Sequence, residues 1–595
     1  MHMEIKAKIS ALREAMSKEG VKAYIIPSAD AHLSEYTPER WKGRAWISGF
    51  DGSAGTVVVT DKKAGLWTDS RYFLQAESDL KGSEIELFKM GMPGVISIEE
   101  FLLQELNQGD IAACDGNCYA HTDAEETRSQ LSQKNIKLRT DIDLFTEIWK
   151  DRPSIPAEKI FTHPDKYAGK SVKQKIETVL DKLHKKGCNA TIMTMLDEVA
   201  WAFNIRGYDV PFNPVAVVYG YISDKESILF VLPHKIDKDV IAHLEAEGVK
   251  VKDYHEIVSY LGQLGQEVKL FVDPKRISEA IFEAIPQHCQ KIYGVSIVTM
   301  LKAVKNDVEI KGLRDVMERD GVALTRFFMW LEKVLKEGAT PSEVEIGEKL
   351  ASFRAQDEQY YGDSFDTIAG YQAHGAIVHY SAKPETAFNL KAEGVLLLDS
   401  GGQYKDGTTD ITRTLALSAP GADLKKDYTL VMKGHIGIAT AQYPEGTRGG
   451  QLDILARKAL WDEGLNYGHG TGHGVGCFLN VHEGPQNIRT EINPTVLEPG
   501  MITSNEPGLY RAGKYGIRIE NLVVTRLNTE TEFGKFFGFE TLTMCYFDNN
   551  LIEKSLLTES EIKWYNDYQK TVYDRLSPRL NKEEAEWLKA KTAAI

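Results

Sequence analysis

A chain of 595 residues cannot bury its apolar side chains in a single core, because domains rarely grow beyond ~250–300 residues. Helix-like and strand-like segments alternate along the first 150 residues, as in an α/β domain. Helices are expected at 5–18 and from 72 to 78, and strands at 23–27, 55–60 and 65–68. Two prolines within 151–156 then mark a break between domains.

A second segment repeats this alternation. Helices are expected at 171–186 and 196–204, and strands at 190–193, 215–219, 227–232 and 268–272. The first two segments have similar lengths and element orders, which suggests a duplicated domain.

The third segment opens with a long helix, since apolar residues from Ile310 to Leu335 recur at a helical spacing. A second helix follows Thr340, which can act as its N-cap, while Glu343 can close a capping box. Strands dominate from 368 to 525, and a charged helical tail covers 559–591. The expected domain ranges are therefore 1–155, 156–304 and 305–595.

Charge and cysteine content restrict the partners and the cellular compartment that we expect for the protein. The net charge is −15, which argues against nucleic acid or an anionic membrane as a partner. Of six cysteines only Cys114 and Cys118 lie close together, so we expect reduced thiols rather than a disulfide framework. The N-terminus lacks an apolar signal segment, and no run of ~18 apolar residues occurs. We therefore expect a cytoplasmic protein without a membrane span.

Two aspartates occupy the arms of an expected β-hairpin. The apolar run 395–398 ends in Asp399, and a turn signal at 405–407 leads to Asp410. The turn can bring both carboxylates to one face, where they would repel unless they share a proton or a cation. Each aspartate taken alone also fits an ordinary role, as a strand-end cap or a turn residue.

The segment 468–476, with the sequence GHGTGHGVG, departs most from an ordinary strand or helix. Its glycines would let the backbone pass close to a site and aim His469 and His473 into it. A phosphate loop is less well supported, because the lysine of a P-loop is missing and no helical pattern follows. A structural turn remains the third reading.

Glutamates end or interrupt two further strand patterns. Glu506 follows the strand-like residues 501–505 and precedes a proline. In the pattern 516–524, alternation places Arg518 and Glu520 on one face and the isoleucines on the other. A buried Glu520 would need a partner, whereas a solvated strand face would not.

Together these side chains match the ligand set of a two-metal site. Four carboxylates carry a charge of −4, which two divalent cations would balance; the proposed ligands are Asp399, Asp410, His473, Glu506 and Glu520. Oxygen-rich ligation with a single imidazole suits manganese, and also cobalt or zinc. Two metals ~3.5–4 Å apart can share a water and lower its pKa, so the expected chemistry is metal-assisted hydrolysis.

The same five positions resemble the ligands of the pita-bread metallopeptidases, which include methionine aminopeptidase, prolidase and aminopeptidase P. The aspartates match the family's hairpin pair, and the motifs GHGTGHGVG, SNEPG and GIRIEN carry the other three ligands. His379 in AIVHY and His482 in NVHEG match substrate-side histidines, and His469 lies where proline-specific members carry another.

The resemblance implies a division of roles. A water or hydroxide bridging two metal ions would attack the peptide bond, and Glu506 would pass its proton to the leaving nitrogen. His379 and His482 would hydrogen-bond the substrate carbonyl and the developing oxyanion. Arg71 would hold the substrate from the first domain, although a surface ion pair explains it equally well. The expected substrate-binding set is Arg71, His379, His469, His473, His482 and Arg518.

Motifs in the first two segments resemble the three-domain cytosolic form of aminopeptidase P, among them TDSRYF, DEVAW and RGYDVP. The implied fold class is α/β, with two creatinase-like domains before a pita-bread catalytic domain. Ser70 departs from the pattern, since relatives usually have glycine there. The resemblance implies an aminopeptidase that removes the first residue of peptides with proline second, contains manganese and forms a homodimer.

Two alternatives share much of this pattern. A prolidase, which cuts Xaa-Pro dipeptides, would have all five ligands. A non-enzymatic pita-bread binding module would have lost ligands, and none is lost here. The residues that form a proline pocket are not identifiable from the motifs.

Overall fold

The computed structural model describes residues 2–595, with side chains from Glu4 onward. The chain divides into two compact units, which are described separately. The first comprises the residues up to Pro164 together with Lys170–Thr299, and the second comprises Asp165–Gly169 together with Met300–Ile595.

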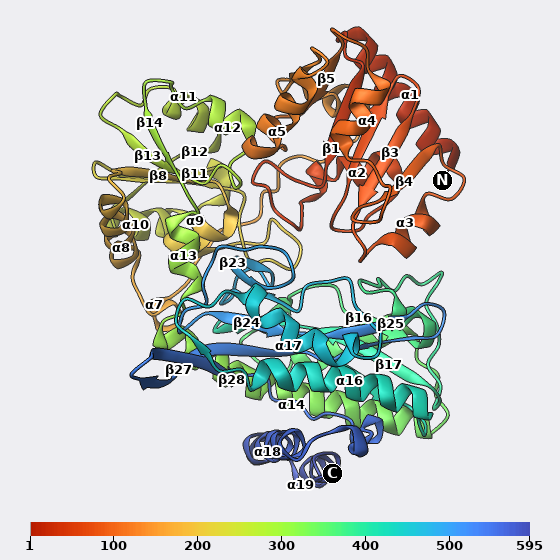
Figure 1. Cartoon of the computed structure of the whole chain (residues 1–595). Coiled ribbons are helices and arrows are strands. Elements are labelled where there is room, and N and C mark those ends of the chain that lie inside the picture. The colour runs from red at the N-terminus through yellow and green to blue at the C-terminus, as the bar shows by residue number, and fades with distance from the viewer. Residues whose placement is uncertain (1) are drawn as a thin grey trace. The chain divides into compact units, whose positions relative to one another are not determined.

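The first unit contains two sheets (Figure 1). Each has six strands, and the two have the same topology. In the first the order is β4-β3-β2-β1-β5-β6, and in the second it is β12-β11-β10-β8-β13-β14. In both sheets the third strand in the order, β2 or β10, pairs antiparallel with both of its neighbours, and the other three pairings are parallel, as expected of a duplicated domain. The strands are Ala23–Pro27, Thr56–Thr60, Ala64–Thr68, Ile85–Lys89, Ile111–Cys114 and Lys137–Arg139 (β1–β6), then Ala190–Met193, Tyr219–Ser223, Ser227–Val231, Val249–Asp253, Lys269–Val272 and Gln290–Tyr293 (β8, β10–β14).

Helices cover both faces of the first sheet. Alternating residues of β1 and β2 pack on α1 (His2–Lys18) on one side and on α4 (Ile98–Glu105) and α5 (His121–Ser132) on the other. The expected strand 215–219 is wrong: residues 215–218 form a loop, and β10 starts at Tyr219. The backbone N–H of Val217 donates to the Asp209 carboxylate at 2.6 Å, so it is not available to a sheet.

The second unit is built around α14 (Asp307–Lys336), whose apolar face joins the main core, as its spacing predicts. A three-stranded antiparallel sheet runs β16-β17-β20, and a six-stranded sheet runs β21-β28-β27-β24-β22-β23. Two helices that the sequence reading did not anticipate, α16 (Ala422–Ala439) and α17 (Gly449–Trp461), pack against each other within the strand-rich region. The strands of the two sheets are Ile368–Tyr371, Val395–Ser400 and Ile411–Ala416 (β16, β17, β20), then Tyr443–Pro444, Gly472–Gly474, Glu483–Ile488, Ile502–Asn505, Asn521–Thr531 and Gly534–Thr541 (β21–β24, β27, β28).

Two local predictions in this unit are wrong. The N-cap of α15 (Glu343–Arg354) is Ser342, and Glu345 closes the capping box, so Thr340 and Glu343 do not have the capping roles expected of them. The pattern 516–524 is not one strand. It breaks at residues 519–520 into β26 (Tyr515–Arg518) and β27, which belong to different sheets.

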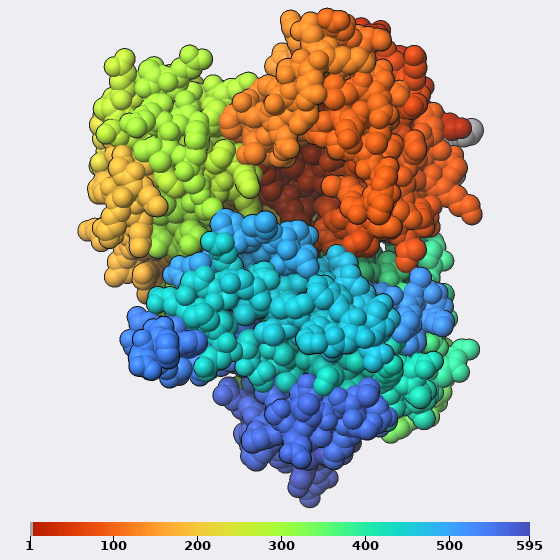
Figure 2. Space-filling model, in the orientation of Figure 1, coloured from red at the N-terminus to blue at the C-terminus, as the bar shows by residue number. Residues whose placement is uncertain are grey.

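The chain ends in α18 (Glu559–Leu576) and α19 (Lys582–Lys591), which pack on α14 as the predicted helical tail. In the space-filling view these residues form a compact dark-blue lobe (Figure 2). All six cysteines are free and buried. Across residues 2–595, none of the helices is both long and apolar enough to cross a membrane.

Candidate metal centre

The two aspartates come together through the pairing of β17 with β20. Asp399 lies in β17 opposite Thr412, and Asp410 immediately precedes β20. The predicted turn at 405–407 joins β18 (Gly402–Tyr404) to β19 (Gly407–Thr408), a small hairpin inserted between the two arms. The expected antiparallel arrangement of the arms is therefore confirmed, with extra strands between them.

The other three ligands come from the six-stranded sheet. His473 lies in β22, Glu506 directly follows β24, and Glu520 lies at the break before β27. The last register pair of β24 and β27 joins Asn505 to Asn521, so the two glutamates extend from the same end of this ladder. A Cβ at Gly472 would lie 2.0 Å from the Ser504 carbonyl oxygen, which shows why the loop needs glycine here.

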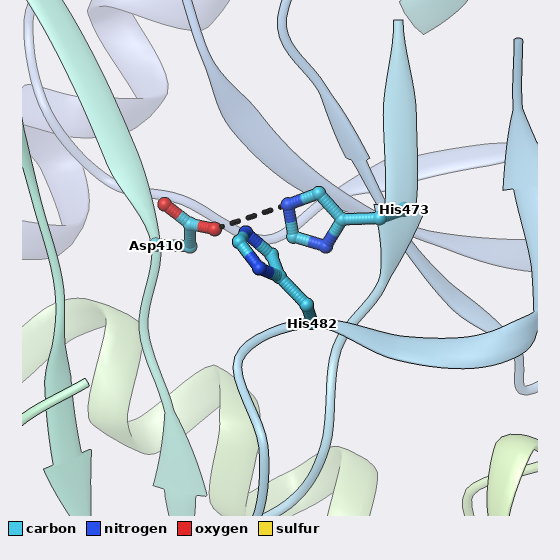
Figure 3. A group of neighbouring side chains, drawn as sticks. All are labelled: Asp410, His473 and His482. Atoms are coloured by element: carbon cyan, nitrogen blue, oxygen red, sulfur yellow. Dashed lines mark ion pairs between the residues drawn. The ribbon is translucent and has the colours of Figure 1, made fainter. Parts of the chain in front are cut away.

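These side chains form one continuous cluster. Asp399, Asp410 and Glu520 have ligand atoms within 4.8 Å of one another, and so do His473, Glu506 and Glu520. The Nε2 atom of His473 lies 3.4 Å from Asp410 Oδ2 and 3.4 Å from Glu506 Oε1, and Figure 3 shows the first of these ion pairs. All five predicted ligands therefore converge.

Burial and mutual repulsion raise the proton affinity of this cluster. Burial raises the pKa of Glu520 well above its usual range, and the charges of Asp410 and Glu506 add to the effect. Burial also raises the pKa of Glu506 to about 7, against the opposing charge of His473. Burial lowers the pKa of His473, but a hydrogen bond with Asp410 and the charge of Glu506 outweigh it and raise the pKa to about 9. Without cations, the cluster would have to retain protons.

The donor geometry fits divalent cations. The Oδ1 atom of Asp399 is buried without a hydrogen-bond partner, although an unpaired buried carboxylate oxygen is costly. The Nδ1 atom of His473 donates to the Gly474 carbonyl at 2.9 Å, so Nε2 directs a lone pair or a proton at two carboxylates. Cations among these atoms would satisfy the orphaned oxygen, the lone pair and the excess negative charge together.

Three groups hydrogen-bond the predicted ligands. Arg518 is 2% exposed and donates to Asp399 Oδ2 at 2.6 Å, so it holds this carboxylate in place. The hydroxyl of Thr412 donates to Glu520 Oε2 at 2.7 Å, and that of Ser504 donates to Glu506 Oε1 at 3.0 Å. The sequence reading missed both hydroxyls, although each lies two residues from a ligand, the spacing that puts side chains on one face of a strand.

His469 is tied to the cluster through a residue that the sequence did not single out. Its Nε2 atom lies 2.7 Å from the hydroxyl of Tyr510, which accepts a hydrogen bond from Arg518 at 2.8 Å. Because Arg518 in turn holds Asp399, a chain of hydrogen bonds runs from His469 to a ligand. Burial raises the pKa of Tyr510 to about 12, so this hydroxyl keeps its proton.

The remaining predicted residues have different surroundings. The ring of His482 stands edge-on to that of His473, with centroids 4.4 Å apart, and His482 also groups with Asp410 (Figure 3). His379 is partly exposed on the irregular segment after η4 (Gln372–Ala376). Arg71 belongs to the first unit, where it pairs with Asp69 at 2.8 Å.

Comparisons with known proteins agree with this geometry. Residues 8–144 and 151–309 each match the model of a creatinase/prolidase N-terminal domain, 311–526 match metallopeptidase family M24, and 535–595 match the C-terminal region of that peptidase. A protein of Laccaria bicolor described as "Probable Xaa-Pro aminopeptidase P" is 42% identical over 99% of this chain and 93% of its own length. Aminopeptidase P2 of Arabidopsis thaliana is 41% identical over 97% of this chain and 86% of its own length.

A solved structure matches as well. An X-prolyl aminopeptidase from Caenorhabditis elegans, described as a cytosolic enzyme with a di-nuclear active site, superposes with a TM-score of 0.96. The two chains are 35% identical, and the match covers all of both.

Proposed function

The chain belongs to the Xaa-Pro aminopeptidase P family of M24 metallopeptidases, and on that premise we propose that it removes the N-terminal residue from peptides with proline in the second position. The observation that carries the proposal is the buried cluster of four carboxylates and one imidazole, complete in its ligand set. A non-enzymatic binding module would have no use for four carboxylates held this close together.

Two divalent ions are the cofactor that this site is built to hold, and manganese is the proposed metal because oxygen donors dominate. Asp399, Asp410, His473, Glu506 and Glu520 are the proposed ligands. When bound, the ions would supply Lewis-acid activation of the scissile carbonyl and of a water nucleophile.

The chain's own groups would handle the proton and the developing charge. Glu506 is the proposed carrier that takes a proton from the nucleophile and gives it to the leaving nitrogen, because it is the carboxylate that directly follows β24 at the edge of the cluster. Arg518 keeps Asp399 oriented, and it donates to Tyr510 as well. His379 and His482 are proposed to donate hydrogen bonds to the substrate carbonyl and the oxyanion.

We also propose a substrate-binding set, domain ranges, a location and an oligomeric state. Arg71, His469, His473, His482 and Arg518, together with His379, form the proposed substrate-binding set. The penultimate proline presents no N–H, so an apolar slot rather than a hydrogen-bond acceptor should receive it. We also propose the domain ranges 1–155, 156–304 and 305–595, a cytoplasmic location and a homodimer, whose mass analytical ultracentrifugation would measure.

Hydrolysis of an Xaa-Pro-Yaa tripeptide tests the proposal. Metal-stripped protein should be inactive and should regain activity when manganese is added back. Cleavage of an Xaa-Pro dipeptide but not of the tripeptide would favour a prolidase instead. Manganese-loaded protein that cuts neither peptide would refute the aminopeptidase.

A further inference from the structure

Glu343 is a buried carboxylate that neither the metal cluster nor the helix cap explains. It lies in the first turn of α15, and its side chain is 0% exposed. Ser342 and Glu345 form the capping box of this helix, so the cap does not need Glu343. A buried carboxylate is retained only where several donors compensate its charge.

The donors to Glu343 all come from one segment of the chain, residues 371–388. The backbone N–H groups of Tyr371 and Phe388 donate at 2.8 and 2.7 Å, and the hydroxyl of Tyr380 donates at 2.8 Å. The Nδ1 atom of His374 lies 3.0 and 2.9 Å from the two carboxylate oxygens. The Glu343 carboxylate is therefore hydrogen-bonded to the start, the middle and the end of this segment.

Other contacts also hold parts of this segment: Tyr371 pairs with Leu396 of β17, and Tyr380 packs with Ile368 and Leu397. Between η4 and β17 the described chain forms no helix or strand. The ring of His374 is stacked between those of Tyr380 and Phe388, with centroids 4.4 and 3.6 Å apart, so the stack is itself assembled from Glu343's partners. On another side the segment borders a pocket of about 440 Å³ lined in part by Tyr371, Gln372 and Phe388, so packing does not fix it there.

His379 lies inside this segment and directly precedes Tyr380, one of the donors to Glu343. We infer that Glu343 is a positioning residue for His379: by collecting four donors from residues 371–388, it sets where the histidine meets the substrate. The inference rests on the proposed function, because it needs His379 to act on the peptide during turnover.

A double-mutant cycle distinguishes this role from a merely structural one. The full chain with manganese is assayed on an Xaa-Pro-Yaa peptide as wild type, E343Q, Y380F, H379A, and the two doubles E343Q/H379A and Y380F/H379A. E343Q replaces an acceptor oxygen by an amide that cannot serve four donors. We expect kcat/KM to fall by about tenfold or more in E343Q, mostly through kcat, since small misplacement of a group that acts in the transition state is costly.

Y380F removes a single hydroxyl and keeps the ring stack. If E343Q does not fold, the double-mutant cycle can therefore be measured with Y380F alone. In the H379A background the added loss from either variant should shrink to less than about twofold, because the group being positioned is gone. E345Q is the matched control: glutamine can still close the capping box of the same helix, so it should leave kcat/KM unchanged and lower Tm by at most a degree or two.

Additive losses in both cycles, full activity in both E343Q and Y380F, or full activity in H379A would each overturn the inference. Failure of the proposed function is a separate outcome, since wild-type protein would then cut no peptide. In that case amide exchange decides: E343Q should speed exchange in 371–391 and leave β17 and β20 protected, and unchanged exchange in 371–391 would overturn the positioning role.

Discussion

Glu506 is the proposed proton carrier, and the hydroxyl of Ser504 orients it by donating to its Oε1 atom at 3.0 Å. The variant E506Q should lower kcat by roughly 10²- to 10⁴-fold, because the amide cannot accept the proton. Peptide hydrolysis measures the effect, and metal analysis of the same sample separates lost chemistry from lost metal.

E540Q is the control for this variant, because Glu540 is a partly exposed carboxylate paired with Arg314 and Arg526. It should leave kcat unchanged. Turnover of E506Q within threefold of wild type, with both metals retained, would contradict the assigned role.

The pKa shifts in the cluster predict how pH affects the metal-free protein. Burial raises the pKa of Glu506 from 4.5 to about 7, and the carboxylates raise that of His473 from 6.5 to about 9 against the effect of burial. Both groups bind protons more tightly when folded, so their contribution to stability is complete at low pH and is lost as pH rises through about 7 and 9. Metals replace those protons.

The increase in Tm on adding manganese to stripped protein should therefore grow between pH 6 and pH 9. Thermal unfolding with and without chelator at each pH measures this difference and cancels the titration of distant groups. An increase in Tm that shrinks over this range would contradict the cluster's predicted protonation.

The roles of some single residues can be predicted from the sequence, and those of others cannot. The convergence of the five proposed ligands could be predicted because each stands beside a local signal: a strand end, a turn or a run of glycines. Tyr510 could not, because a tyrosine in a short strand has no pattern that marks a hydrogen bond to His469. Glu343 was misread for the same reason, since its donors are 28–45 residues away along the chain.

At the scale of elements, the contact between η4 and β26 links the His379 segment to the metal centre. A Cβ at Gly516 would lie 1.7 Å from the Gly375 carbonyl oxygen, and Arg518 follows two residues later in β26. G516A should therefore separate the two elements, cost ~1–3 kcal/mol of stability by overpacking, and lower kcat/KM. Chemical unfolding and peptide kinetics measure these effects.

G421A is the matched control, because nothing lies within 4 Å of a Cβ placed there. It should leave kcat/KM unchanged and cost no more than ~1 kcal/mol of stability, because Gly421 is the N-cap of α16 and alanine is a poorer cap. Wild-type stability in G516A would mean that η4 and β26 do not approach as closely as described.

Element boundaries were predicted well where an apolar repeat extends over many residues. They were predicted poorly where tertiary contacts determine where a strand ends. The spacing of apolar residues located α14 within a few residues of its ends. The strand pattern 516–524 looked continuous, but Glu520 lies where the chain passes from one sheet to another. Alternation in sequence cannot reveal such a change of sheet, because both halves keep the same local pattern.

At the scale of the whole molecule, all five ligands belong to the second unit. Metal binding should therefore slow amide exchange around the ligand-bearing strands β17, β20, β22, β24 and β27, because binding to the folded state alone stabilises it. The two sheets of the first unit should show unchanged exchange. Hydrogen exchange with mass spectrometry measures both, and metal-dependent protection confined to β1–β6 would contradict the location of the site.

The duplication in the first unit was suggested by similar segment length and element order, and the identical sheet topologies support it. Sequence could not supply the strand pairings, because these depend on contacts between distant segments.

The central claim is that five side chains bind two cations between them. Anomalous diffraction at the manganese edge, from crystals of manganese-loaded protein, tests it most directly. We expect two peaks ~3.5–4 Å apart, enclosed by Asp399, Asp410, His473, Glu506 and Glu520. No peak among these residues, or peaks ligated by other side chains, would contradict it.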